Sequence, residues 1–224
     1  MQQPTIDKYL IAACLLIIDE FNLMYKDYDL EKLKKLADEK FNEMDITVRI
    51  GYPFKQMVHY TVGENRKKNK DSQKINHDLY VEQHDFKIEI KYLKNWISTS
   101  DTRSVSKNWK AFQKDFDWLM DELDNRGDGK TAFVIGWFNC VTSFSKLIQL
   151  GKGGGAYPLA DAVKVSYFPF LKKDKEPIRT KELQYNYEKA YRVLPVNLIS
   201  TRNVEYNCIF LGNPNDCFHF AIYY

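Results

Sequence analysis

Two acidic residues and a lysine in the middle of the chain have the types and spacing that metal-assisted phosphate chemistry uses. The stretch KIEIKYL, residues 87–93, alternates charged and apolar residues. In an extended strand Glu89 and Lys91 project from one face, because successive side chains point to opposite faces. Asp78 lies shortly upstream, in HDLYVEQ, residues 77–83. These residues are candidates for half of a catalytic site.

Residues 78–93 are predicted to form an antiparallel hairpin. This pairing places Asp78 opposite Ile90 and within reach of Glu89 and Lys91, because side chains across two paired strands lie close together. Ile90 faces the other way, into a core. Two carboxylates and one ammonium are therefore expected to converge at the end of the hairpin.

Clustered carboxylates suit Mg²⁺ or Mn²⁺, which prefer oxygen ligands and bind phosphate oxygens while keeping several waters. Such a metal polarises a phosphate and lowers the pKa of a bound water. A lysine two residues beyond the second acid can orient that water and stabilise charge in the transition state. The expected cofactor is Mg²⁺, for which Mn²⁺ can substitute.

This arrangement resembles the PD-(D/E)XK nuclease superfamily, which includes restriction, repair and recombination nucleases. Asp78 matches the first acid, and Glu89-Ile90-Lys91 matches the (D/E)XK part, while His77 replaces the proline. The resemblance implies that Asp78 and Glu89 bind metal, together with the backbone carbonyl of Ile90. It also implies that Asp78, Glu89 and Lys91 are the catalytic residues of a Mg²⁺-dependent deoxyribonuclease.

Members of that superfamily often place a glutamate from the first helix near the metal. Glu20, in LLIIDEF, is the candidate for that ligand, with Asp19 as its rival. An acid on a mostly buried helix needs a partner, and a metal would serve. The alternative is that Glu20 lies on a narrow polar stripe of the helix.

The short acid-x-lysine pattern also occurs at Asp38-Glu39-Lys40 and Asp128-Gly129-Lys130. The first is predicted in an amphipathic helix, where the two side chains diverge, and the second in a turn. Glu89-Ile90-Lys91 differs because it lies in an alternating strand that follows a strand beginning with an acid. The competing interpretation is a solvated strand face with ordinary cross-strand ion pairs.

The elements expected from hydrophobic periodicity give an α/β chain with a mixed sheet. Helices are predicted at 5–25, 30–44, 104–123 and 183–192, and strands at 46–52, 56–62, within 78–93, at 131–138, at 163–169 and in three segments of the last thirty residues. The superfamily core runs helix, three-stranded meander, helix, strand, in the same order. The resemblance thus implies a restriction-endonuclease-like core over 5–140, with 141–224 as a β-rich extension of the same domain.

Basic residues near the motif are candidates for nucleic-acid binding. They are Arg66, Lys67, Lys68 and Lys70 in the polar segment 63–77, and Lys107, Lys110 and Gln113 on the helix 104–123. Lysines that contact phosphates gain affinity by releasing counterions. The alternative for each is a solvated surface. The glycine-rich stretch 151–156 lacks phosphate-loop spacing and is predicted to be a loop, with a nucleic-acid contact left open.

The 224-residue chain has a formal net charge of only +3, so any nucleic-acid affinity must come from local patches. Its four cysteines show no CxxC pairing, and its first apolar run is too short for a bilayer, which favours a cytoplasmic protein without a membrane. DNA is the expected partner, with RNA and a homodimer left open. The expected function is a restriction-like endonuclease. The alternative is a catalytically inactive nucleic-acid- or protein-binding module that retains the fold.

Overall fold

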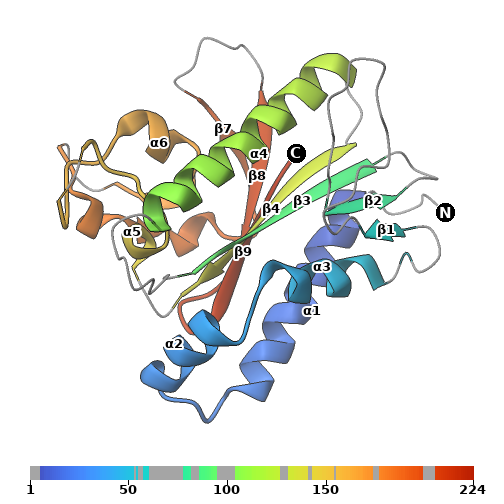
Figure 1. The fold of residues 1–224 in the computed structure, drawn as a ribbon, viewed down its shortest axis with the longest axis horizontal. Coiled ribbons are helices and arrows are strands. Elements are labelled where there is room, and N and C mark those ends of the chain that lie inside the picture. Colours follow the sequence, from blue (N-terminus) through green and yellow to red (C-terminus); the bar gives the residue numbers. More distant parts are fainter. Residues whose placement is uncertain are drawn as a thin grey trace.

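A seven-stranded mixed sheet forms the centre of the computed structural model (Figure 1). Its strand order is β1-β2-β3-β4-β9-β8-β7. The strand bounds are β1 Val58–Tyr60, β2 Leu79–Val81, β3 Phe86–Leu93, β4 Ala132–Asn139, β7 Val193–Val196, β8 Tyr206–Leu211 and β9 Phe218–Tyr223. Strands β3 and β4 are parallel, and every other neighbouring pair in this sheet is antiparallel. The expectation of an α/β chain with a mixed sheet is therefore confirmed.

The structure describes residues 6–52, 54, 58–60, 78–81, 86–94, 104–126, 131–140, 143–153, 155–173, 177–198 and 205–224. The predicted nucleic-acid contacts Arg66, Lys67, Lys68 and Lys70 lie outside these ranges, as does His77. Among the described residues, no helix combines the length and the apolar character that a membrane crossing requires.

Helices cover both faces of the sheet. The helix bounds are α1 Ile6–Met24, α2 Leu30–Glu39, α3 Glu43–Gly51, α4 Ser104–Arg126, α5 Phe144–Leu147 and α6 Ala162–Ser166. Helices α1 and α3 pack on one face with Ile88 and Ile90 of β3. Helix α4 packs on the other face, together with the segment between β4 and β7 (Figure 1). Side chains of β4 are buried on both faces, as its continuous apolar run predicted.

The parallel pair β3–β4 is connected through α4, which crosses the sheet between them. Parallel strands require such a crossover because the end of one strand and the start of the next lie at opposite ends of the sheet. The crossover brings one side of α4 over β3. It therefore places α4 side chains next to the charged residues of KIEIKYL.

The predicted strand 46–52 is wrong, because these residues belong to α3. Asn42 caps that helix by accepting from Met44 N, and Asp45 accepts from Asn42 N in return. Ile46 and Ile50 are buried at a spacing of four, while Val48 is 48% exposed. Ile46, Val48 and Ile50 alternate as in a strand, but Ile46 and Ile50 also lie on one face of a helix. The capping box at Asn42 favours the helix.

Two further predictions in the C-terminal third are wrong, and the predicted helix 30–44 is interrupted. Residues 163–169 begin within α6, where Asp161 caps the helix by accepting from Val163 N. Residues 183–192 form the short strand β6, Gln184–Tyr185, and a single 3-10 turn. The helix 30–44 ends at Glu39, and α3 starts anew at Glu43.

The three C-terminal strands join the central sheet. Strand β9 pairs with β4, β8 with β9, and β7 with β8. A separate two-stranded sheet pairs β6 with β5, Leu171–Lys172. The β-rich residues after 141 therefore complete the sheet that holds β3.

Candidate active site at the edge of β3

Strand β3 continues beyond the end of its neighbour β2. The pairing runs from Val81↔Phe86 to Leu79↔Ile88 and includes no later residue of β3. The other edge of β3 pairs with β4 as far as Leu93. Ile90 and Tyr92 direct their backbone groups toward the edge that β2 leaves open within the described part of the chain, because alternate residues of a strand share one hydrogen-bonding side.

Two carboxylates occupy this open edge. Asp78, immediately before β2, accepts a hydrogen bond from Ile90 N at 2.7 Å through Oδ2. Glu43, the first residue of α3, accepts from Tyr92 N at 3.2 Å through Oε1. Buried backbone N–H groups need partners, and here side-chain oxygens provide them in place of a neighbouring strand. The prediction that Asp78 lies beside Ile90 is confirmed.

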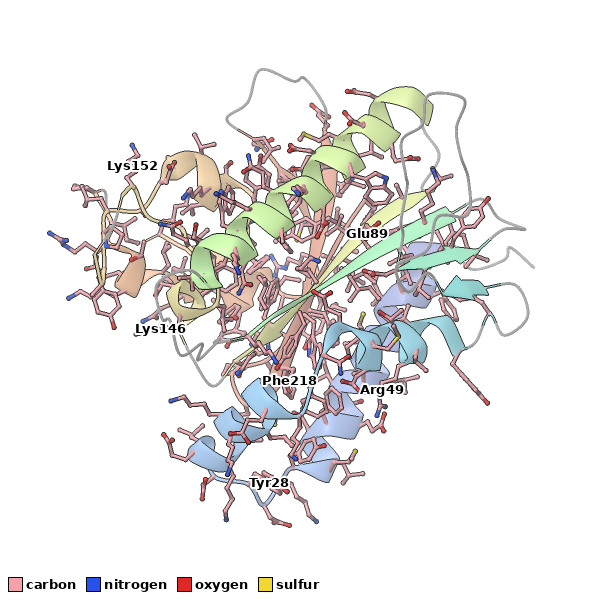
Figure 2. All side chains as sticks on the ribbon, viewed as in Figure 1. Tyr28, Arg49, Glu89, Lys146, Lys152 and Phe218 are labelled. Atoms are coloured by element: carbon pink, nitrogen blue, oxygen red, sulfur yellow. The ribbon has the colours of Figure 1, made fainter. Side chains whose placement is uncertain are left out.

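Glu89 and Lys91 project toward α4, as the alternation along β3 predicted. Figure 2 marks Glu89 on β3. Lys91 Nζ lies 3.3 Å from Glu43 Oε1 and 3.5 Å from Asp115 Oδ2 of α4. The Lys91 and Asp115 side chains are only 20% and 16% exposed. We call Asp78, Glu89, Glu43 and Asp115 the carboxylate cluster, with Lys91 at its centre.

Burial raises the pKa of Glu89 to about 9, and the charges of Asp78 and Glu43 contribute to this rise, while Lys91 opposes it. Burial likewise raises the pKa of Asp115 to about 7, again against Lys91. Burial lowers the pKa of Lys91, but Asp115, Glu43 and Asp78 more than compensate, so its pKa is raised. If all four carboxyl groups were ionised, one ammonium would not balance them, and the cluster would be short of positive charge.

The donors in the cluster suit a hard divalent cation. Asp78 and Glu89 supply carboxylate oxygens, and the Ile90 carbonyl points to the same open edge as its N–H. Asp115 Oδ2 is buried without a hydrogen bond. However, the described part of the chain holds no group of three or more His, Cys, Asp or Glu in a geometry that could hold a metal. The fit therefore rests on two carboxylates, one carbonyl and the charge deficit.

A second ion pair fixes α4 on β3. Lys87 Nζ lies 2.8 Å from Glu122 Oε1, with side chains 12% and 14% exposed. Lys87 and Lys91 are about 13 Å apart along a strand, and Glu122 and Asp115 are about 10 Å apart along a helix. The two pairs, Lys87–Glu122 and Lys91–Asp115, therefore hold α4 antiparallel to β3 and set the position of Asp115.

Glu20 is placed away from this cluster. It forms an ion pair with Arg49 of α3, and its side chain is 46% exposed. Helix α1 packs on the Ile90 face of the sheet, whereas Glu89 points to the α4 face. Arg49 therefore provides the partner that was expected for Glu20. The helical glutamate next to Lys91 is Glu43, from the helix that immediately precedes the antiparallel strands.

Sequence reasoning missed Glu43 and Asp115. Asp115 had a usable signal, because it lies between Phe112 and Phe116 on the edge of the apolar face of α4. A carboxylate at such a position needs a buried partner. Glu43 had no comparable signal, since it became a neighbour of Lys91 only through the docking of α3 against β3.

The predicted nucleic-acid-binding residues on α4 differ in exposure. Lys107 and Lys110 are exposed, and Gln113 is half-buried. On a helix Gln113 lies about 160° around the axis from Asp115, on the far edge of the exposed face. Whether these residues contact nucleic acid stays a prediction.

No protein-family model matches this chain, and neither a curated protein nor a solved structure matches it significantly. The chemistry of the carboxylate cluster is therefore inferred from its own residues and geometry.

Proposed function

We propose that this protein is a divalent-metal-dependent nuclease that hydrolyses DNA phosphodiester bonds, in the manner of the restriction-like PD-(D/E)XK endonucleases. The observation that carries the proposal is the hydrogen bond from Ile90 N to Asp78 Oδ2, at 2.7 Å. It brings the first acid of the motif against the Glu89-Ile90-Lys91 segment, from a different strand. A solvated strand face would not bury Glu89 and Lys91 among three further carboxylates.

The order and direction of the elements also support the proposal. Helices precede the antiparallel strands β1, β2 and β3, then α4 follows, and β4 lies parallel to β3. The superfamily core has the same sequence of elements. Similar order alone is an analogy of fold, so the functional proposal depends on the cluster.

Each residue of the site has a role in this proposal. Asp78, Glu89 and the Ile90 carbonyl would hold Mg²⁺, for which Mn²⁺ can substitute. A metal held there would polarise the phosphate and lower the pKa of a water molecule. In the hydrolysis, the water oxygen would bond to phosphorus and give up one proton, while the bond to the leaving oxygen would break and that oxygen would take up one proton.

Lys91 provides the fixed positive charge of the site. Asp115, Glu43 and Asp78 raise its pKa, which keeps it an ammonium at neutral pH. Its ion pairs with Glu43 and Asp115 orient it. A positioned ammonium stabilises the negative charge that develops on the phosphate in the transition state.

Cleavage of supercoiled plasmid and of linear DNA with Mg²⁺ or Mn²⁺ tests the proposal. We expect the wild type to cut and Glu89→Gln and Lys91→Met to lose at least about a hundredfold in rate, the usual scale for one electrostatic catalytic group. Lys35→Met, on the exposed side of α2, is the matched control and should cut normally. Equal activity in the Lys91→Met variant and the wild type would overturn the assignment of this site.

The second candidate is a nucleic-acid-binding module that keeps this fold without catalysis. It is favoured by the ion pairs that already engage Lys91 with Glu43 and Asp115. A melting-temperature series with Mn²⁺ distinguishes the two functions. A metal that binds the folded state raises the melting temperature, so a shift that disappears in Asp78→Asn supports the nuclease. DNA binding with neither a metal shift nor cleavage supports the module.

A further inference from the structure

The segment 143–192 carries an excess of positive charge. Its described residues, here called the basic lobe, include nine Lys or Arg and three Asp or Glu, although the whole chain has a net charge of only +3. Two of the three acids accept hydrogen bonds from backbone N–H groups: Asp161 from Val163 N, and Glu182 from Arg179 N. Nine cationic side chains against three acids leave the described residues of the lobe with an excess of six positive charges, so the lobe presents a positive surface.

Tyr157 lies among these cations as an exposed aromatic ring. Its side chain is 39% exposed, and Lys146 Nζ lies 5.6 Å from the ring centroid. Arg179 Nη1 donates to the Tyr157 carbonyl at 3.2 Å. Lysine, arginine and an exposed ring in one place match the surfaces on which bases stack while cations contact the phosphates.

A glycine-rich turn extends the surface beside Tyr157. A Cβ on Gly151 would lie 2.1 Å from Pro158, so the base of the turn is tightly closed. Gly153 and Gly155 have φ angles of 79° and 107°, and a Cβ on either would meet nothing within 4 Å. The space beside Gly153 and Gly155 is therefore open next to the exposed Lys152. Lys146 and Lys152 are both marked in Figure 2.

The exposed charges of helix α4 are positive in its first half and negative in its second half. The first half carries three exposed lysines and the second half three exposed aspartates: Lys107, Lys110 and Lys114, then Asp117, Asp121 and Asp124. The helix dipole favours the opposite order, with acids near the N-terminus and bases near the C-terminus. Stability of the helix therefore does not account for this arrangement, whereas attraction of a polyanion to one half does.

The basic half of α4 adjoins the basic lobe. Asn108 Nδ2 donates to the Leu147 carbonyl at 2.7 Å, and the Trp109 and Tyr167 rings meet edge to face at 5.4 Å. Both α5 and α6 lie at this end of α4 in Figure 1. The lobe and the carboxylate cluster, with Asp115 on α4, are on the same side of the sheet.

We propose that the basic lobe and the first half of α4 form a surface that binds the DNA substrate outside the cleavage site. Lys146, Lys152 and the α4 lysines contact phosphates, and Tyr157 stacks on a base. The aspartates of the second half repel the backbone and so direct the strand toward the carboxylate cluster. The choice of DNA rests on the proposed nuclease function.

Fluorescence anisotropy with labelled duplex and single-stranded DNA, in EDTA and over a salt series, tests the surface without cleavage. The lobe variant is Lys146→Glu/Lys152→Glu, since both side chains are exposed. The matched control is Lys8→Glu/Lys35→Glu, exposed on α1 and α2, with the same change in net charge. Tyr157→Ala is measured separately. The Mn²⁺-induced rise in melting temperature is recorded for every variant.

We expect the lobe variant to bind DNA at least about tenfold more weakly at 50 mM salt and to lose about two units of the salt slope, one for each phosphate contact. Tyr157→Ala should weaken single-stranded binding with little change in slope, and both should keep the Mn²⁺ shift. Equal losses in the lobe and control variants, or no DNA binding by the wild type, would overturn the inference. A missing Mn²⁺ shift and missing cleavage in a wild type that binds DNA through the lobe would instead overturn the nuclease function.

Discussion

Asp78 reaches across from the start of one strand to the backbone of the next: its Oδ2 accepts from Ile90 N at 2.7 Å. This contact exists because β2 ends where β3 continues. An edge that lacks a strand partner must satisfy its N–H groups in another way. Carboxylates meet that need at Ile90 and Tyr92, and they gather negative charge beside Glu89 and Lys91.

Glu89→Gln should stabilise the metal-free protein at pH 8. The pKa of Glu89 is raised to about 9 in the fold, against about 4.3 in an unfolded chain. Between these values the folded state binds more protons than the unfolded state, so stability falls as pH rises through this window. Removing the titrating group should therefore add on the order of 5 kcal/mol at pH 8, measured by urea unfolding in EDTA.

The same variant should gain nothing from Mn²⁺, whereas the wild type should gain stability at pH 8. Asp124→Asn, an exposed position of α4, serves as the control for a lost negative charge. A Glu89→Gln protein that is less stable than the wild type at pH 8 without metal would show that Glu89 is ionised and well paired there.

Asp115→Asn and Glu43→Gln should slow cleavage by loosening Lys91. Each removes one of the two ion pairs that orient the ammonium. We expect kcat to fall about ten- to a hundredfold with little change in KM, since a positioning defect acts mainly in the transition state. Asp27→Asn, exposed just after α1, is the control. An unchanged kcat in both variants would show that Lys91 needs neither partner.

Lys87→Met should destabilise the protein by about 3 kcal/mol, because it removes the lysine that pairs with the buried Glu122. The double variant Lys87→Met/Glu122→Leu should recover most of that loss, since replacing both partners removes the uncompensated charge. Chemical denaturation of the four members of the cycle measures the coupling. Equal losses in the single and the double variant would contradict a coupled buried pair.

Acid should destabilise the fold through His219. Burial lowers its pKa to about 4, and its Nε2 lies 3.0 Å from the Tyr187 hydroxyl. The unfolded chain, with a histidine pKa near 6.5, binds the proton first as pH falls, so stability is lost between about pH 6.5 and 4.

His219→Gln lacks this titration, and its loss of stability from pH 7 to pH 5 should be smaller than that of the wild type by about 2 kcal/mol. Urea unfolding at both pH values gives the difference. Parallel pH curves for the two proteins would mean that His219 titrates alike in the folded and unfolded states.

The pattern of residues was enough to predict which face of an element each side chain occupies. The alternation in 87–93 correctly placed Glu89 and Lys91 on one side of a strand and Ile88 and Ile90 in the core. The long apolar run of β4 correctly indicated burial on both faces. These predictions succeeded because a side chain's direction within one element depends only on local backbone geometry.

Contacts between residues of different elements depended on how the chain packs. Glu43 and Asp115 were missed because their partner Lys91 lies on another element and meets them only through the docking of α3 and α4 against β3. Glu20 instead found Arg49 on a neighbouring helix. Strand lengths, the open edge of β3 and the docking of α3 and α4 depend on packing between distant segments. Local periodicity does not report that packing. The face of β3 that carries Glu89 and Lys91 was therefore predictable, whereas the contribution of Glu43 and Asp115 was not.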